Sequence, residues 1–490
     1  MTTSDTPIDD RGNPAAILAV VLGSYFMILL DNSIIFTALP TIRTALDLSV
    51  TGLSWVQDAY TLVFGGLLLL GARAGDLLGR RRVFITGLAV FSIASLLVGV
   101  APSGWWMIAA RALQGVGAAI VAPTSLSLLT ASFPEGPLRS RAVAWYGATA
   151  GIGASLGLVL GGALADWISW RAGFFLNVPI GIAMIVLAPR YLPETARSTG
   201  RFDVAGAVSA TLGVGAIVFG VINSGESGWA SPVTVWALLI GVILLAVLVA
   251  GEKRAEQPIM PLRLFGDRQR VGAYLARLLY MGAMIGFFYF TTQFMQNVLG
   301  FSALQAGVAF LPMTVVNFVV AMAIPRLVAR FGEVLPLLGG IALTLAGMVW
   351  LSGVAPGSSY WVGVAAPMLL IGAGQGLAFA PLTSAGIAGV PARDAGAASG
   401  LVNTFHQLGM ALGLGILVAI SANTEPEQSS AVEAMAALVR VALAGASALL
   451  GVCLLVACAL IGLRPGRARQ NRVEGLRHGE PIAAASAGSN

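Results

Sequence analysis

Residues 53–101 read LSWVQDAYTLVFGGLLLLGARAGDLLGRRRVFITGLAVFSIASLLVGVA. Two apolar runs, at about 53–72 and 83–101, flank the polar segment GDLLGRRR at 75–82. A helix needs about 20 mostly apolar residues to cross a bilayer, so each run is long enough for one crossing. Three adjacent arginines indicate a cytoplasmic connection, because basic residues collect in cytoplasmic loops. This stretch therefore predicts a hairpin of two transmembrane helices.

Stretches of this kind make up most of the chain. It has 490 residues, of which 57% are hydrophobic and 10% are charged, whereas charged residues form about a quarter of a soluble domain. We predict an all-α polytopic membrane protein with fourteen transmembrane helices. The fourteen runs lie at about 15–39, 53–72, 83–101, 105–130, 142–165, 173–190, 204–222, 233–250, 272–296, 303–325, 335–353, 360–383, 398–421 and 440–463.

The distribution of basic residues predicts the orientation. Of 28 Lys and Arg residues, three lie in odd-numbered connections (Arg43, Arg171 and Arg440) and two lie inside runs (Arg111 and Arg277). The other 23 lie in the N-terminal segment, the even-numbered connections and the C-terminal tail. Both termini are therefore predicted to be cytoplasmic. The Arg-, Ala- and Gly-rich composition is typical of a high-GC bacterium, so we expect a bacterial cytoplasmic membrane.

Two pairs of similar segments indicate an internal repeat with an offset of about 255 residues. Residues 71–82, GARAGDLLGRRR, are similar to PRLVARFG at 325–332, and GVGAAIVAP at 115–123 is similar to GQGLAFAP at 374–381. The repeat predicts two six-helix halves that bracket an extra helix pair. The expected segments are a cytoplasmic N-terminus 1–14, a first half 15–191, the extra pair 204–250, a cytoplasmic linker 251–271, a second half 272–463 and a disordered cytoplasmic tail 464–490.

Charged residues inside the runs are the first candidates for function. Asp31 lies in the first run and Arg111 in the fourth; with 1.5 Å of rise per residue, they lie roughly 12 Å and 9 Å below the same membrane surface. An ionisable group at such depth is costly unless it has a partner or faces water. We expect Asp31 to carry a proton and its pairing with Arg111 to break on protonation; the alternative is a permanent structural ion pair. Asp58 is a further proton-coupling candidate, or an interfacial residue.

The connection after the second run carries a second candidate motif. Asp76, Gly79, Arg80 and Arg81 follow the run directly. The arginines alone would serve as an orientation anchor. Asp76 can also cap the cytoplasmic N-terminus of a helix in the other half, where the helix dipole favours an anion. The thirteenth run, which begins near Gly396, has its N-terminus on the required side, so we expect a conformational latch there.

Small and polar residues inside the runs complete the candidates. Gly153, Gly157 and Gly161, with Gly162 beside them, form a stripe on one helix face. Such a stripe permits close helix packing and, between two moving halves, sliding without leakage. Six polar residues are candidates for the wall of a substrate cavity: Gln114, Asn317, Gln375, Asn403, His406 and Gln407.

These features resemble the major facilitator superfamily, and specifically its fourteen-span drug:proton antiporter branch. LDNSIIFTALP at 30–40 resembles the first-span signature of that branch, and residues 76–82 resemble the loop motif of the superfamily. RALQG at 111–115 is similar to the fourth-span motif, whose arginine is associated with proton transfer. The glycine stripe resembles the antiporter motif, and WR at 170–171 with FLNVPIG at 175–181 matches a further segment.

The chain departs from the family pattern at two positions. Ala72 stands where the loop motif usually opens with Gly, although Gly71 is adjacent. Leu158 stands where the antiporter motif normally has Pro after its second Gly. The second departure removes a helix kink and so weakens the inference of antiport.

The resemblance implies a proton-coupled exporter of amphipathic drugs or antibiotics that works by alternating access between two halves. Its energy source would be the proton gradient, with no cofactor and no metal, and we expect a functional monomer. Because the last six runs contain no Asp or Glu, we expect neutral or singly cationic substrates.

The alternatives are a dedicated exporter of one endogenous secondary metabolite and, from another class, a channel or non-coupled facilitator. No catalytic constellation indicates an enzyme, and the scattered basic residues do not indicate nucleic-acid binding.

Overall fold

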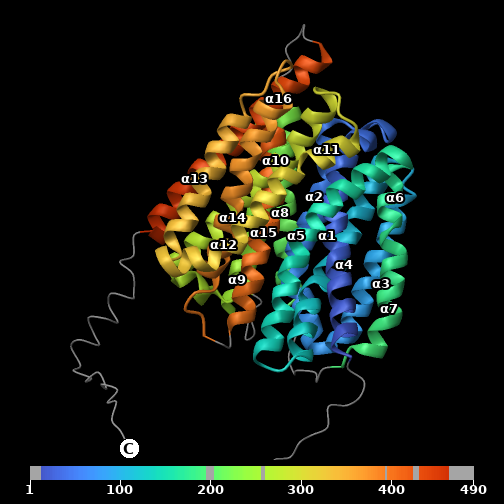
Figure 1. The fold of residues 1–490 in the computed structure, drawn as a ribbon, viewed down its shortest axis with the longest axis vertical. Helices are drawn as coiled ribbons and strands as arrows, with labels where there is room; N and C mark the ends of the chain where they lie inside the picture. Colours follow the sequence, from blue (N-terminus) through green and yellow to red (C-terminus); the bar gives the residue numbers. More distant parts are fainter. Residues whose placement is uncertain (1–12, 195–202, 255–259, 392–393, 423–429, 463–490) are drawn as a thin grey trace, which may run out of the picture.

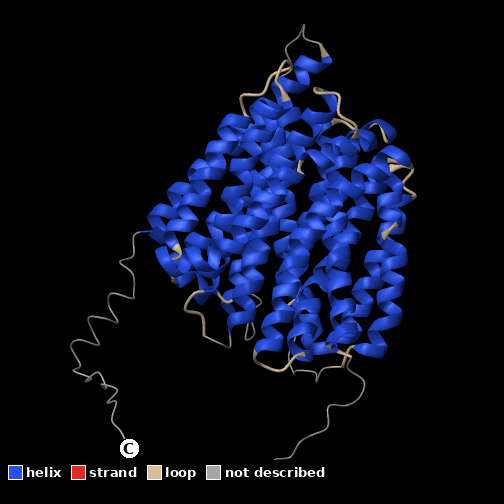
Figure 2. Ribbon diagram, in the orientation of Figure 1, coloured by secondary structure: helices blue, strands red, loops and turns tan. Residues whose placement is uncertain are grey.

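A computed structural model describes residues 13–194, 203–254, 260–391, 394–422 and 430–462. These residues form helices and connecting loops, with no strand among them (Figure 2). Nearly all of the expected N-terminal segment 1–14 and the whole tail 464–490 lie outside the described residues. The helices are α1 (Pro14–Ala45), α2 (Val50–Leu78), α3 (Arg80–Gly99), α4 (Gly104–Ser132), α5 (Pro137–Trp167), α6 (Trp170–Phe175), α7 (Asn177–Tyr191), α8 (Val204–Ser227), α9 (Pro232–Arg254), η1 (Leu262–Gly266), α10 (Arg268–Asn297), α11 (Ala303–Ala309), α12 (Leu311–Phe331), α13 (Val334–Leu351), η2 (Tyr360–Ala365), α14 (Ala366–Ile387), α15 (Ala395–Ser421), α16 (Ala431–Ala457) and η4 (Cys458–Gly462).

By length and composition, fourteen helices in the described residues can cross a membrane. Four of these crossings are composite, with two helical segments in line: α6 with α7, α11 with α12, η2 with α14, and α16 with η4. The number of crossings and the helix-only fold confirm the prediction from the sequence. The chain is therefore a multi-pass membrane protein.

Local sequence explains where the helices begin and end. Ser49 caps α2 by accepting a hydrogen bond from the Gly52 amide at 3.0 Å, and Asp267 caps α10 in the same way through the amides of its first turn. Gly79 separates α2 from α3 with a φ of +101°. Side chains with a Cβ atom rarely adopt this backbone conformation, whereas glycine adopts it readily. The glycine of the GDLLGRRR segment thus lets two long helices meet without an intervening loop.

The helices form two halves that lie side by side. Figure 1 shows α1–α7, coloured blue to green, next to the helices from α10 to the end of the described chain, coloured mainly yellow to red. Below, these are the N-terminal half and the C-terminal half. The end of the bundle where α2 meets α3 is called the Gly79 end.

The extra pair α8 and α9 lies against the seam between the halves. One hydrophobic cluster joins Leu62 of α2, Val218 of α8 and Ala411 of α15. Glycines permit close approach on both sides, because a Cβ on Gly66 would overlap Thr211 of α8 and a Cβ on Gly225 of α8 would overlap Ala419 of α15. Helix α9 packs on α8 and is largely exposed. The pair therefore bridges both halves through α8.

Candidate functional site

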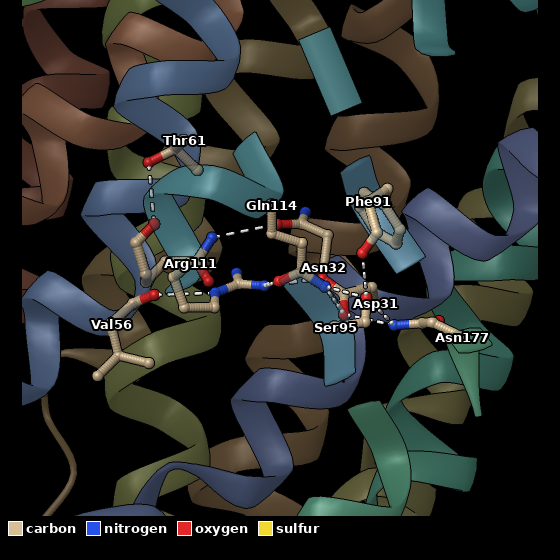
Figure 3. A network of polar contacts seen from close by, with 10 residues as sticks. Asp31, Asn32, Val56, Thr61, Phe91, Ser95, Arg111, Gln114 and Asn177 are labelled. Atoms are coloured by element: carbon tan, nitrogen blue, oxygen red, sulfur yellow. Dashed lines mark hydrogen bonds and ion pairs between the residues drawn. The ribbon is translucent and has the colours of Figure 1, made fainter. Parts of the chain in front are cut away.

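Asp31 and Arg111 form an ion pair that is completely buried. The Asp31 Oδ2 atom lies 2.7 Å from the Arg111 Nη1 atom, and neither side chain is exposed. Asp31 comes from the middle of α1 and Arg111 from the first third of α4. The two side chains meet there, as their similar expected depths predict (Figure 3). The predicted partners therefore meet in the structure.

Three further side chains complete the surroundings of Asp31. Its Oδ1 atom accepts hydrogen bonds from Gln114 Nε2 and from Asn177 Nδ2, each at 2.8 Å. Ser95 accepts a hydrogen bond from Gln114 at 2.8 Å. The network thus joins four helices of the N-terminal half: α1, α3, α4 and α7 (Figure 3). A buried ion pair repays its desolvation cost only when such hydrogen bonds satisfy the remaining donors and acceptors, which these residues largely do.

Asp58 is buried but stands apart from this network. Its side chain on α2 has no exposed surface, and within the described chain neither carboxylate oxygen accepts a hydrogen bond. The preceding residue, Gln57, donates to Asn32 on α1 at 3.1 Å. An ionised carboxylate without a partner is costly in a buried site. Asp58 therefore stays a candidate for proton coupling, one that lies outside the network of Asp31.

A cavity of about 1970 Å³ lies between the two halves. It is lined by residues of α1, α2, α4 and α5 on one side and of α10, α12, α14 and α15 on the other. It extends to the Gly79 end, where Asp76, Arg80, Arg263 and Asp394 line it. Five of the six expected cavity residues belong to the wall: Asn317, Gln375, Asn403, His406 and Gln407.

One expectation about the cavity needs correction. Gln114 does not line it, because its side chain is taken up by the bonds to Asp31 and Ser95. Asp31 also lies behind the wall rather than in it, since Asn32 and Ser33 of the same helix turn face the cavity. The Asp31 carboxylate and the cavity are therefore neighbouring places in this conformation, not a shared one.

Some residues of the site were missed at the level of sequence. Asn177 and Ser95 were not singled out, although Asn177 is a polar residue between apolar runs and belongs to the segment FLNVPIG. Arg277 was noted inside a span but not assigned to the cavity, which it lines. The signal for all three was a polar side chain at membrane depth.

Among the described residues, the loop motif at the Gly79 end contacts its own half. Asp76 accepts hydrogen bonds from Arg80 Nε at 3.2 Å and Arg80 Nη2 at 3.0 Å. Arg80 also donates to the Ser127 carbonyl of α4 at 3.3 Å, and Arg81 donates to the Leu192 carbonyl after α7 at 3.1 Å. Gly396, in the first turn of α15, lines the same cavity as Asp76. The contact of Asp76 with the N-terminus of α15 stays a prediction, for a conformation in which this end is closed.

The glycine stripe of α5 packs against α1 of its own half. A Cβ on Gly157 would lie 2.6 Å from the Ser33 Cβ atom, and one on Gly161 would lie 2.7 Å from the Ile34 Cα atom. Gly162 alone of the four faces the other half, where its Cβ would lie 2.4 Å from the Ala303 carbonyl oxygen of α11. The stripe as a whole is therefore not the sliding surface between halves; Gly162 is the part that meets the partner half.

We expect Gly157→Ala to lower the free energy of unfolding by about 1–3 kcal/mol, because the added methyl group overpacks the contact of α5 with α1. The matched control is Gly151→Ala on the same helix, where a Cβ meets nothing within 4 Å. Thermal unfolding of the two variants in detergent measures the difference. Equal melting temperatures for both variants would show that α1 and α5 can separate without cost.

Two contacts join the halves at the end opposite Gly79. The Asp166 carboxylate, at the end of α5, accepts hydrogen bonds from the Ala303 and Leu304 amides of α11 at 3.0 and 2.9 Å. Gln296 of α10 donates to the Thr37 carbonyl of α1 at 3.0 Å. The cavity thus reaches the Gly79 end, while polar contacts hold the opposite end together.

Comparison with known proteins agrees with this architecture. The model of the Major Facilitator Superfamily matches residues 21–414. The cephamycin export protein CmcT of Amycolatopsis lactamdurans is 41% identical over 409 residues, which cover 82% of this chain and 84% of the relative. The puromycin resistance protein pur8 of Streptomyces alboniger is 37% identical over 410 residues, covering 82% and 81%.

A solved structure shares the fold at low sequence identity. It is a bacterial homologue of the human lysosomal transporter Spinster in an inward-facing, unoccupied conformation, with a TM-score of 0.62 and 16% identity, and the match covers 92% of this chain and 99% of that one. The fold, the matched family model and the relatives give one conclusion. The chain belongs to the major facilitator superfamily, which confirms the resemblance seen in its motifs.

Proposed function

We propose that the chain is a proton-coupled exporter of amphipathic drugs or antibiotics in a bacterial cytoplasmic membrane. Its relatives are named for cephamycin export and for puromycin resistance, and the cavity between its halves offers room for compounds of such size. Membership of a transporter family favours transport over catalysis. The protein would act as a monomer, without a cofactor, using the proton gradient as its energy source.

The observation that carries the proposal is the buried Asp31–Arg111 pair directly behind the cavity wall. Protonation of Asp31 removes the negative charge that balances Arg111. The network that joins α1, α3, α4 and α7 then loses its central charge, while Asn32 and Ser33 on the same turn of α1 face the cavity. A shift of α1 therefore changes the cavity wall, so proton binding and substrate binding influence each other through one helix. Asp58 provides a second buried carboxyl group for the same task.

The basic residues orient this cycle in the membrane. If both termini are cytoplasmic, the Gly79 end faces the cytoplasm and Asp166 holds the external end closed. The structure then represents the conformation that admits substrate from the cytoplasm. Breaking the Asp166 contacts and closing the Gly79 end, with Asp76 at α15, would expose the cavity to the outside.

Transport in inverted membrane vesicles tests the proposal. With an acidic lumen, vesicles that contain the protein should accumulate a fluorescent amphipathic dye, and an uncoupler should abolish this uptake, because export from the cytoplasm corresponds to uptake into the inverted lumen. Vesicles without the protein provide the background. Dye flux that persists after collapse of the gradient would indicate a channel or facilitator, and transport of a single cellular metabolite but no dye would indicate a dedicated exporter.

A further inference from the structure

Arg277 places a positive charge deep in the cavity wall. It lies on α10, nine residues after Arg268, the first residue of that helix. At 1.5 Å of rise per residue, Arg277 is therefore about 14 Å along the helix. The side chain is 3% exposed and belongs to the cavity lining. Arg277 is thus a buried cation beside the space that a transported molecule would occupy.

The partners of Arg277 are all neutral groups. Its Nη2 atom lies 3.1 Å from His406 Nδ1, and its Nη1 atom lies 3.3 Å from Thr383 Oγ1 and 3.5 Å from the Phe379 carbonyl oxygen. The guanidinium also lies over the Phe379 ring, 3.9 Å from its centroid. Since an arginine can only donate, His406 accepts through Nδ1 and is itself uncharged in this contact.

No carboxylate balances Arg277 within the described part of the chain. Arg111 shows the contrast, because Asp31 lies 2.7 Å away from it. A guanidinium has five N–H donors, and the three hydrogen bonds above use three of them. The Nε atom of Arg277 has no acceptor among the described residues. Since Nε is also buried, the site keeps its positive charge and one N–H of Nη2 for a further acceptor.

The other charges of the cavity do not cancel this one. Four arginines and two aspartates line the cavity in the described chain: Arg73, Arg80, Arg263, Arg277, Asp76 and Asp394. Each aspartate is bonded to an arginine at the Gly79 end, Asp76 to Arg80 and Asp394 to Arg263. Asp31 and Asp58 do not belong to the lining. The described aspartates of the wall thus do not neutralise Arg277, which favours a negatively charged group near it.

The surroundings of Arg277 fit an apolar body attached to that charged group. Met281, Met284 and Phe288 continue along α10 into the cavity wall. On the facing wall, the rings of Tyr25 and Tyr146 stack with their centroids 4.0 Å apart. Aromatic and methionine side chains provide large, adaptable contact surfaces for apolar ligands.

We propose that Arg277 binds the carboxylate of an amphipathic monoanionic substrate in the central cavity. The planar fork of an arginine matches a carboxylate in shape and charge, and an anion removes the cost of an unbalanced buried cation. The proposal rests on the proposed export function for its physiological role. It changes the substrate charge expected from the sequence, because that expectation considered only the absence of Asp and Glu from the last six spans and left out Arg277, which lies in the first of these spans.

Binding of three probes to the unmodified protein in nanodiscs is the first test. Pyrenebutyrate, pyrenebutanol and pyrenebutyl-trimethylammonium share one apolar group and carry a negative, zero and positive charge. At about pH 8, where a carboxylic acid is ionised, pyrenebutyrate should bind about tenfold more tightly than the cationic probe after subtraction of empty nanodiscs. Equal affinity, or tighter binding of the cation, would overturn the proposal without any variant.

Variants then locate the anion site at Arg277. Arg277→Gln should weaken pyrenebutyrate binding by about tenfold to a hundredfold, the effect of losing one charge-assisted hydrogen bond, and leave pyrenebutanol binding within about twofold. Arg277→Lys keeps the charge and should retain most of the affinity. Arg254→Gln, which removes an exposed arginine at the end of α9, is the control for net charge. Equal losses for acid and alcohol would assign Arg277 a structural role, and no loss for the acid would refute the site.

Vesicle transport separates this proposal from the exporter itself. If Arg277→Gln vesicles still accumulate a neutral dye under a proton gradient while pyrenebutyrate uptake falls, both proposals stand. If pyrenebutyrate binds through Arg277 but no dye or probe is transported by the unmodified protein, the export function fails and the anion site remains. If gradient-driven export is normal but Arg277→Gln binds pyrenebutyrate as tightly as the unmodified protein does, the anion site alone is wrong.

Discussion

Asp31→Asn is expected to reduce gradient-driven dye uptake in inverted vesicles to the background of vesicles without the protein. The amide has nearly the same shape as the carboxylate and keeps an oxygen that accepts hydrogen bonds, but it cannot take up or release a proton near neutral pH. Asp31 lies at the centre of a network from four helices. Removing its titration therefore removes the event that links the gradient to helix movement.

Glu135→Gln is the matched control for Asp31→Asn. It also exchanges one carboxylate for an amide, but the Glu135 side chain is 90% exposed in the connection before α5. Its uptake rate, normalised to the amount of protein in the membrane, should equal that of the unmodified protein. Gradient-driven uptake that survives in Asp31→Asn would transfer the coupling role to Asp58, and loss of uptake in Asp58→Asn alone would settle that assignment.

Arg111→Gln is expected to lower stability by about 3–5 kcal/mol, because it leaves the Asp31 carboxylate buried without its balancing charge. Arg111 Nε also donates to the Val56 carbonyl of α2 at 3.0 Å, so the substitution loosens a helix contact as well. Thermal unfolding in detergent, together with the yield of monodisperse protein, measures the loss.

The double variant Asp31→Asn/Arg111→Gln separates charge balance from transport. It removes both charges, so most of the stability lost in Arg111→Gln should return, since replacing a whole buried pair costs far less than breaking it. Gradient-driven uptake should remain at background. Stability that stays as low as in the single variant would show that the pair contributes through shape and hydrogen bonds rather than through its opposite charges.

The number of spans followed from hydropathy, because the bilayer imposes a length on each crossing. Their limits followed less closely: α16 begins nine residues before the predicted run 440–463, at Ala431. The Asp31–Arg111 pair followed as well, since helical rise alone places two residues at one depth. Rotation about the helix axis is set by packing between helices, and no pattern within one span reveals it. For this reason Gln114 was expected at the cavity although it faces Asp31, and the glycine stripe was expected between the halves although it faces α1.

The charge of the cavity could not be read from the spans separately. Arg111 and Arg277 look alike in the sequence, each a single arginine in an apolar run. Their difference is tertiary, because α1 brings a carboxylate to Arg111, whereas α14 and α15 bring Phe379 and His406 to Arg277. A count of acids and bases along the chain cannot distinguish a neutralised arginine from one left open to a ligand.

The position of α8 makes the two flanks of the transporter unequal. On one flank, α8 and α9 cover the seam between α2 and α15. On the other, Ile152 of α5 and Phe318 and Met322 of α12 line the cavity, and their side chains are 46%, 49% and 63% exposed in the described chain. In a bilayer this second flank meets the acyl chains. Under the proposed export function, we expect a compound dissolved in the lipid to reach the cavity past α5 and α12, because the extra helix pair covers the other flank.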